Sequence, residues 1–198
     1  DMIEADALIL HLNPLQEELQ PEGDTRFAGL LAKIEQVSRN LPVPLIVKEV
    51  GWGISEKAAG QLASAGVAAI DVAGAGGTSW SQVELFRIKS PQLARVAEAF
   101  RGWGIPTAQS IINVKKAAPQ IPVIASGGLK DGIDLAKCLA LGACLGGMAG
   151  VFLKTGVDSI ERTLEKIEEF HRQTQICMFA TGALNLEQLK PSMLEKAG

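Results

Sequence analysis

Tyrosine is absent from the 198-residue sequence, and aromatic residues make up only 5% of it. Hydrophobic residues nevertheless make up 47%, which excludes general disorder and predicts an aliphatic core. An excess of positive charge is also absent, because 19 basic and 22 acidic residues give a formal net charge of -3. We therefore expect no nucleic-acid partner, since proteins that bind DNA or RNA carry basic surfaces.

Cysteines are few, and a long apolar run is missing. Cys138, Cys144 and Cys177 include no C-x-x-C pair, which argues against a disulfide scaffold or a cysteine zinc site and favours a reducing compartment. The longest uncharged run, 138–153, is glycine-rich and shorter than the roughly 18 apolar residues that a membrane-spanning helix needs. We expect a cytoplasmic protein with no membrane segment.

Short apolar runs alternate with longer amphipathic segments along the chain. The runs predict five buried strands, at 7–11, 43–47, 67–71, 121–125 and 143–147. Helical spacing predicts helices at 27–37, 55–62, 91–101, 107–117 and 131–141. A final long helix is expected to begin at Asp158, with a capping box to Glu161 and with Ile160, Leu164, Ile167 and Phe170 on one side. This order predicts an α/β fold with a parallel sheet covered on both faces, in a single domain over 1–198.

Polar and glycine-rich residues follow the carboxyl ends of these strands, where an α/β barrel or a doubly wound sheet builds its active site. Five strands fit a doubly wound sheet, whereas a complete barrel has about eight. Both folds stay open on this count. A G-x-G-x-x-G fingerprint is absent, which weighs against a dinucleotide-binding fold.

Two consecutive strand ends predict a phosphate site. The turn at 126–129 presents bare backbone N–H groups, and the helix after it adds the positive end of its dipole. Gly146, Gly147 and Gly150 offer a second turn one unit later. The alternative is that these glycines only permit tight turns, but two glycine-rich ends in succession favour phosphate binding.

Lys48 ends an otherwise apolar strand. Its ammonium either faces an electron-rich cofactor or a phosphate, or extends into water. The loop 74–78 can bring backbone close to a planar ligand, although glycine-rich loops are common turns. Trp80 and Glu84, just beyond it, either cover a pocket mouth or belong to a local helix.

His11, Asn13, Gln16 and Glu17 follow the first strand within one short stretch. They offer an imidazole, two amides and a carboxylate that can bind Mg²⁺ beside a diphosphate. Taken singly, His11 is more often a core histidine and Glu17 a solvated charge. His171 is expected at the surface.

Together these strings resemble the type 2 isopentenyl-diphosphate isomerase family, whose members are flavin-dependent. The matching strings are H-L-N-P-L-Q-E (11–17), V-K-E-V-G (47–51), D-V-A-G-A-G-G-T-S-W (71–80), A-S-G-G (125–128), L-G-A (141–143) and A-G (149–150). The resemblance runs to about Leu189. It implies a TIM (β/α)8 barrel that is incomplete here, with strands four to eight of the family barrel. The first three strands and an Arg-Lys diphosphate motif are then expected before Asp1, which is not a methionine.

The resemblance implies an isomerase of isoprenoid biosynthesis that interconverts isopentenyl and dimethylallyl diphosphate. Reduced FMN is then the acid–base catalyst, NADPH reduces it, and Mg²⁺ is required. Lys48 and Thr78 are implied to contact FMN, and the backbone of Gly127, Gly128, Leu129, Lys130, Ala149 and Gly150 to hold its phosphate. Gln16 is implied to contact the substrate and Glu17 to bind the metal. His11, Asn13, Trp80 and Glu84 are implied to line the substrate side.

Two alternatives stay open. Another FMN-dependent barrel enzyme, of the 2-hydroxy-acid oxidase type, shares the phosphate turns but needs a histidine base and an arginine late in the barrel, where this chain has neither. The other is an inactive truncated half-barrel, and we expect residues 1–198 by themselves to have no isomerase activity. An open barrel exposes two strand edges, so we expect a homo-oligomer.

Overall fold

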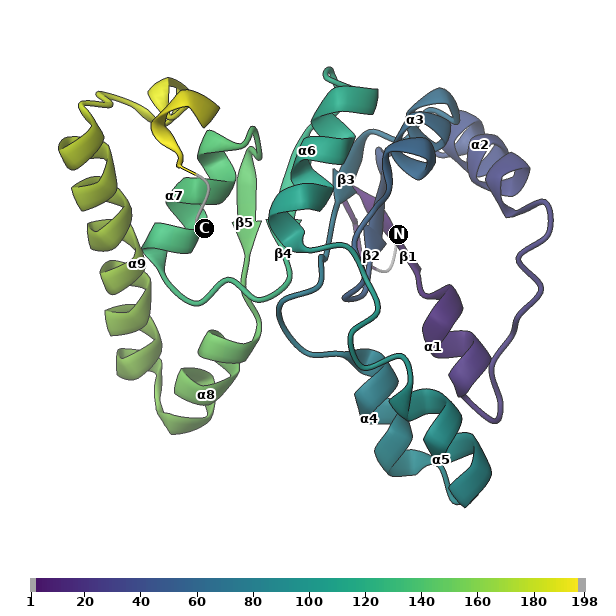
Figure 1. Cartoon of the computed structure of the whole chain (residues 1–198). Coiled ribbons are helices and arrows are strands. Elements are labelled where there is room, and N and C mark those ends of the chain that lie inside the picture. Colours follow the sequence, from purple (N-terminus) through teal and green to yellow (C-terminus); the bar gives the residue numbers. More distant parts are fainter. Residues whose placement is uncertain (1–2, 196–198) are drawn as a thin grey trace.

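The computed structural model describes residues 3–195, which form a five-stranded parallel sheet with helices (Figure 1). The strands are β1 (Leu8–Leu12), β2 (Leu45–Glu49), β3 (Ala69–Asp71), β4 (Val123–Ser126) and β5 (Leu145–Gly147). They lie in the order β1-β2-β3-β4-β5. The α/β class and the five strands are thereby confirmed, although each strand begins one or two residues later than predicted.

Helices follow every strand. They are α1 (Pro14–Leu19), α2 (Leu30–Asn40), α3 (Glu56–Ser64), α4 (Trp80–Arg87), α5 (Pro91–Glu98), α6 (Thr107–Ala117), α7 (Gly132–Ala140), α8 (Gly150–Asp158) and α9 (Ile160–Thr181). Short 3-10 turns follow at Leu186–Gln188 and Pro191–Met193. The sequence patterns did not predict α1 and α8, because a proline-rich and a glycine-rich stretch obscure their helical spacing.

One face of the sheet is buried under helices. Leu45, Val47, Ile70, Val123 and Ala125 are at most 2% exposed, and they belong to one core cluster with Leu62 of α3 and Ile111 of α6. Burying an aliphatic side chain of this size stabilises the fold by about 1.5–3 kcal/mol. This packing fixes the strands against α3 and α6 and leaves their alternate residues on the other face.

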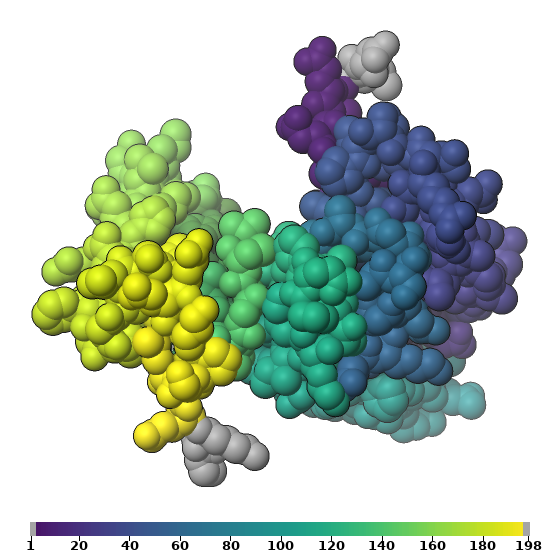
Figure 2. All heavy atoms as spheres, turned by 90° about the horizontal axis from the view of Figure 1, so that it is seen from above, coloured from purple at the N-terminus to yellow at the C-terminus, as the bar shows by residue number. Residues whose placement is uncertain are grey.

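The opposite face is open, so the expectation of a sheet covered on both faces is wrong for the described residues. Ile9 and Leu145, which belong to this face, are 53% and 59% exposed. β1 and β5 are the two edges of the sheet, and the earliest and latest parts of the chain lie at opposite sides of the molecule (Figure 2). Because the strands follow one another across the sheet in chain order, the sheet fits part of a TIM barrel that is not closed rather than a doubly wound sheet. Inner side chains of a closed barrel pack across its axis, which these five strands do not allow.

Helix α9 begins later than predicted. Ser159 rather than Asp158 is its N-cap, and the Ser159 side chain accepts a hydrogen bond from the Arg162 N–H at 3.1 Å. Asp158 instead ends α8. Of the apolar side predicted for this helix, Phe170 is buried while Ile160 is 75% exposed. No helix in 3–195 is long and apolar enough to cross a membrane.

Glycines allow the loop after β3 to touch the turn after β4. The Gly74 N–H donates to the Ser126 carbonyl at 2.8 Å. A Cβ on Gly128 would lie 2.2 Å from the backbone of Gly76, and the φ of Gly128 is +83°. The close approach of two backbone segments therefore requires this glycine, whatever else the turn binds.

We predict that Gly128→Ala lowers the free energy of unfolding by about 2 kcal/mol or more, through left-handed strain and the clash with Gly76. Gly156→Ala is the matched control, because nothing lies within 4 Å of a Cβ there and alanine favours a helix by up to about 1 kcal/mol. Urea denaturation of both variants measures the difference. Equal stability of the two would contradict the close approach.

Candidate active site

Polar side chains from neighbouring strands form a row on the open face, near the carboxyl ends of the strands. His11 of β1 pairs in register with Lys48 of β2, and Lys48 pairs with Asp71 of β3. Asp71 Oδ1 accepts a hydrogen bond from Ser126 Oγ of β4 at 2.6 Å. Because neighbouring strands lie about 4.8 Å apart, the row over four strands is about 14 Å long, which is the length of an extended ligand rather than a small one.

Lys48 is half-buried, and its Nζ donates to the Glu49 carbonyl at 2.8 Å. Within residues 3–195 it has no carboxylate partner at salt-bridge distance. An ammonium placed on an open polar face without a counter-ion suits an anionic ligand.

Glu49 holds the loop that follows Lys48. Its side chain is buried, and Oε2 accepts hydrogen bonds from the N–H groups of Val50, Gly51 and Trp52 at 2.7, 2.8 and 2.6 Å. Burial raises the pKa of the Glu49 carboxyl, and the three N–H donors act in the opposite direction without cancelling that rise. The sequence analysis assigned Glu49 no role. The signal that could have identified it is an acidic residue at the end of an otherwise apolar strand.

Thr78 and Trp80 lie beside the same loop. A Cβ on Gly51 would be 3.0 Å from the Thr78 carbonyl and 3.8 Å from Trp80 Cδ1. Trp80 is the first residue of α4 and is 39% exposed. The structure thus places Trp80 and Glu84 on a local helix and brings that helix next to the Lys48 loop.

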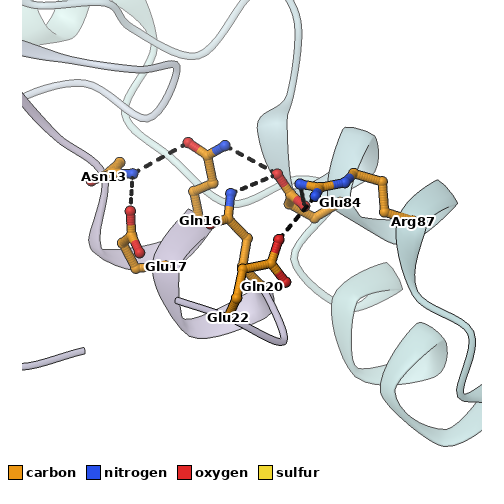
Figure 3. A network of polar contacts seen from close by, with 7 residues as sticks. All are labelled: Asn13, Gln16, Glu17, Gln20, Glu22, Glu84 and Arg87. Atoms are coloured by element: carbon orange, nitrogen blue, oxygen red, sulfur yellow. Dashed lines mark hydrogen bonds and ion pairs between the residues drawn. The ribbon is translucent and has the colours of Figure 1, made fainter. Parts of the chain in front are cut away.

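Glu84 is the most buried member of the polar network in Figure 3, with its side chain 1% exposed. Its Oε1 accepts from Gln16 Nε2 at 3.0 Å and from Gln20 Nε2 at 2.9 Å, and its Oε2 accepts from Arg87 Nη1 at 2.8 Å. Burial acts to raise the pKa of Glu84, but the hydrogen bonds from Gln20 and Gln16 and the charge of Arg87 outweigh it and hold the pKa below its ordinary value. Glu84 is therefore ionised at neutral pH.

Glu17 is held from two directions. Asn13 Nδ2 donates to Glu17 Oε1 at 2.7 Å (Figure 3). The Asp24 N–H donates to Glu17 Oε2 at 2.8 Å. Each carboxylate oxygen keeps a further lone pair that can bind a cation. No group of three or more His, Cys, Asp or Glu side chains suited to a metal occurs in the described residues. A metal at Glu17 needs its other ligands from substrate and water, as Mg²⁺ commonly takes them.

The two predicted phosphate turns lie side by side, because Ser126 of β4 pairs with Gly147 of β5. Within the described chain, the N–H groups of Gly127, Gly128 and Leu129 donate no hydrogen bond. The exposed Ala149 and Gly150 begin α8, whose first-turn N–H groups have no partner within the helix. N–H donors without a partner suit an anion, and we refer to this set of donors as the anion-binding surface.

The dipole of α7 stays a prediction, but two donors of its first turn are already bonded. Gly132 N–H donates to Gln173 Oε1 at 2.7 Å and Asp134 N–H donates to the cap Asp131 at 2.8 Å. The Lys130 N–H also donates to Asp134, at 3.3 Å. The Lys130 N–H is therefore engaged and its side chain is exposed, and α8 keeps more free donors in its first turn than α7. His171 is exposed on α9, as predicted.

Comparison with known proteins finds relatives that match over most of the chain. Residues 18–196 match the family described as FMN-dependent dehydrogenase. The chain is 53% identical over 190 residues to an isopentenyl-diphosphate delta-isomerase of Pseudescherichia vulneris and 53% identical over 192 residues to one of Nostoc sp.. It is 49% identical over 198 residues to one of Cronobacter sakazakii. These matches cover 96%, 97% and 100% of the chain, but 55%, 55% and 57% of the relatives. The chain thus spans little more than half of their length.

We predict a pH-dependent effect of Glu49→Gln on stability. Because folding raises the pKa of Glu49, the folded protein holds this proton more tightly than the unfolded chain, and wild-type stability falls as pH rises above the ordinary glutamate pKa of about 4.3. The variant lacks this loss. Urea denaturation of both proteins from about pH 4 to about pH 7 should show the difference moving in favour of the variant. A constant difference, or one moving toward wild type, would contradict the role of burial.

Proposed function

The chain belongs to the family of FMN-dependent dehydrogenases, and from that premise we propose that it is the carboxy-terminal part of an FMN-dependent, type 2 isopentenyl-diphosphate delta-isomerase. The reaction is the interconversion of isopentenyl and dimethylallyl diphosphate. The observation that carries the proposal is the 49–53% identity of almost the whole chain to proteins of that name.

The anion-binding surface supports a place for the FMN phosphate. The N–H groups of Gly127, Gly128 and Leu129 and the first turn of α8, at Ala149 and Gly150, are the donors that would hold it. Lys130 would add its side chain rather than its N–H. These turns follow neighbouring strands, as in barrels that bind phosphate after their last two strands.

Lys48 and Thr78 would then contact the flavin itself. The position of Lys48 on the open face, in register with His11 and Asp71, supports this assignment. A cation there favours an anionic form of a bound ring. Reduced FMN, when bound, supplies the acid–base group that moves a proton on an unactivated alkene.

The network of Figure 3 supports the substrate side of the site. Gln16 would contact the substrate, and Glu17 would bind Mg²⁺ together with the substrate diphosphate. The ionised Glu84 and the residues His11, Asn13 and Trp80 would line the space around the reacting carbons. Fixed negative charge there can stabilise positive charge that develops when an alkene is protonated.

The 2-hydroxy-acid oxidase alternative finds less support. The sequence contains two histidines. The one that follows the last strand, His171, is exposed on α9 and does not lie at a strand end, where a histidine base would be needed. An inactive half-barrel remains the second candidate, because the sheet is open.

NADPH as reductant, a homo-oligomer and a cytoplasmic location belong to the proposal as further expectations. So do a single domain over 1–198 and the identity of the strands as the fourth to eighth of about eight.

We predict that the protein that contains this chain converts isopentenyl to dimethylallyl diphosphate anaerobically with reduced FMN and Mg²⁺. Lys48→Ala should weaken FMN binding about tenfold or more, because one charge-assisted contact contributes about 1.5–3 kcal/mol. Flavin absorbance and a titration with FMN measure the binding. Lys116→Ala, which removes a surface ion pair with Glu56, is the control. A wild-type protein that binds no FMN would refute the flavin assignment.

We predict that Glu17→Gln raises the Mg²⁺ concentration needed for half-maximal activity about tenfold, since it removes the one carboxylate proposed as ligand. FMN affinity should stay within about twofold, because the phosphate turns follow other strands. A magnesium titration of activity and an FMN titration measure the two effects. An unchanged magnesium requirement would count against Glu17 as the ligand.

A further inference from the structure

Gln20 and Arg87 have no part in the proposed site, yet both bond to Glu84. We propose that they are positioning residues, which hold the Glu84 carboxylate and, through it, keep the Gln16 amide in a single orientation. The proposal rests on the function given above, in which Gln16 contacts the substrate.

The three donors around Glu84 come from two separate parts of the chain. Gln16 lies in α1, and Gln20 is the residue that ends it, 68 and 64 positions from Glu84 in sequence. Arg87 lies one turn after Glu84 in α4, and its Nη2 also pairs with Glu22 Oε1 at 3.0 Å. The network therefore fastens α1 and the segment after it to α4 (Figure 3).

Gln16 and Gln20 approach the same oxygen. They are four residues apart, which places them on one side of the α1 turn, and both donate to Glu84 Oε1. Arg87 takes Oε2. Two donors on one oxygen and a guanidinium on the other leave the buried carboxylate little freedom to rotate.

An ionised carboxylate only accepts hydrogen bonds, so the amide nitrogen of Gln16 must face Glu84 and the amide oxygen must face away. That oxygen lies 3.5 Å from Asn13 Nδ2, which is longer than an ordinary hydrogen bond. Gln16 thus keeps a carbonyl oxygen for a further donor. If Glu84 were protonated it could donate, and the amide could turn over.

The charges around Glu84 are Arg87 on its own helix, Glu22 beyond Arg87, and Glu17 of α1, whose oxygens are bonded to Asn13 and Asp24. Helix α5, which also packs on α4, meets it through Gln82 and the Ala97 carbonyl and places no charge on Glu84 within the described residues. Gln20 and Arg87 are therefore the groups outside the substrate contacts that keep Glu84 charged and fixed.

Activity measurements on the protein that contains this chain test the proposal. Gln20→Leu removes one donor at similar size, and Gln20→Glu keeps the shape but replaces the donor with a second carboxylate. Both should lower kcat about tenfold, with KM changed less than about threefold, since each removes one hydrogen bond to a charged group. Arg87→Met should act similarly, and Arg87→Lys should restore part of the loss. Lys116→Met, which removes an ion pair between α6 and α3, is the matched control and should leave kcat unchanged.

A double-mutant cycle separates positioning from general stability. If Gln20 acts through Gln16, Gln20→Leu should have less than a twofold effect in a Gln16→Leu background. Full additivity of the two losses would overturn the proposal, as would an unchanged kcat in Gln20→Leu and Gln20→Glu.

A second measurement does not depend on isomerase activity. The ¹³C signal of the Glu84 carboxyl, assigned by its loss in Glu84→Gln, reports the pKa of Glu84 during a pH titration. That pKa should rise in Gln20→Leu and in Arg87→Met, because each variant removes a group that favours the charged form. An unchanged pKa would show that Gln20 and Arg87 do not hold the Glu84 carboxylate, even if the protein is an active isomerase. A wild-type protein without isomerase activity would refute the proposed function instead. The titration would still decide whether Gln20 and Arg87 hold the Glu84 carboxylate.

Discussion

Parallel pairing of neighbouring strands is the constraint on which the rest of the structure depends. Because β1 to β5 all run in one direction, every carboxyl end and every loop that follows it meets at the same edge of the sheet. The register then decides which side chains meet, and it aligns His11, Lys48 and Asp71. Side-chain alternation turns these residues away from the core that α3 and α6 cover.

Glycine serves two purposes at this edge. The loop after β3 and the turn after β4 approach so closely that a Cβ on Gly127 would lie 2.1 Å from the Gly74 carbonyl oxygen. The same bare backbone leaves the Gly127 and Gly128 N–H groups free for an anion. The sequence analysis treated tight turning and anion binding as alternatives, and this geometry is compatible with both.

Two buried carboxylates beside the open face are stabilised in different ways. Burial raises the pKa of Glu49, and the three backbone N–H groups that it accepts, together with the charge of Lys48, do not cancel that rise. Burial also acts to raise the pKa of Glu84, but two amides and a guanidinium outweigh it and the pKa is lowered. One carboxylate therefore fixes a loop, whereas the other carries a permanent charge and fastens two helices together.

The sequence by itself determined the α/β class, the five strands and the glycine-rich turns, because apolar runs and bare backbone leave local patterns. It also predicted Asn13, Gln16, Glu17 and Glu84 through a resemblance. Only the tertiary structure decided that one face of the sheet is open, that Gln173 bonds the first N–H of α7, and that Gln16 and Gln20 bond to Glu84. These facts depend on which elements meet across 41 to 68 positions of sequence, and no local pattern records such long-range contacts.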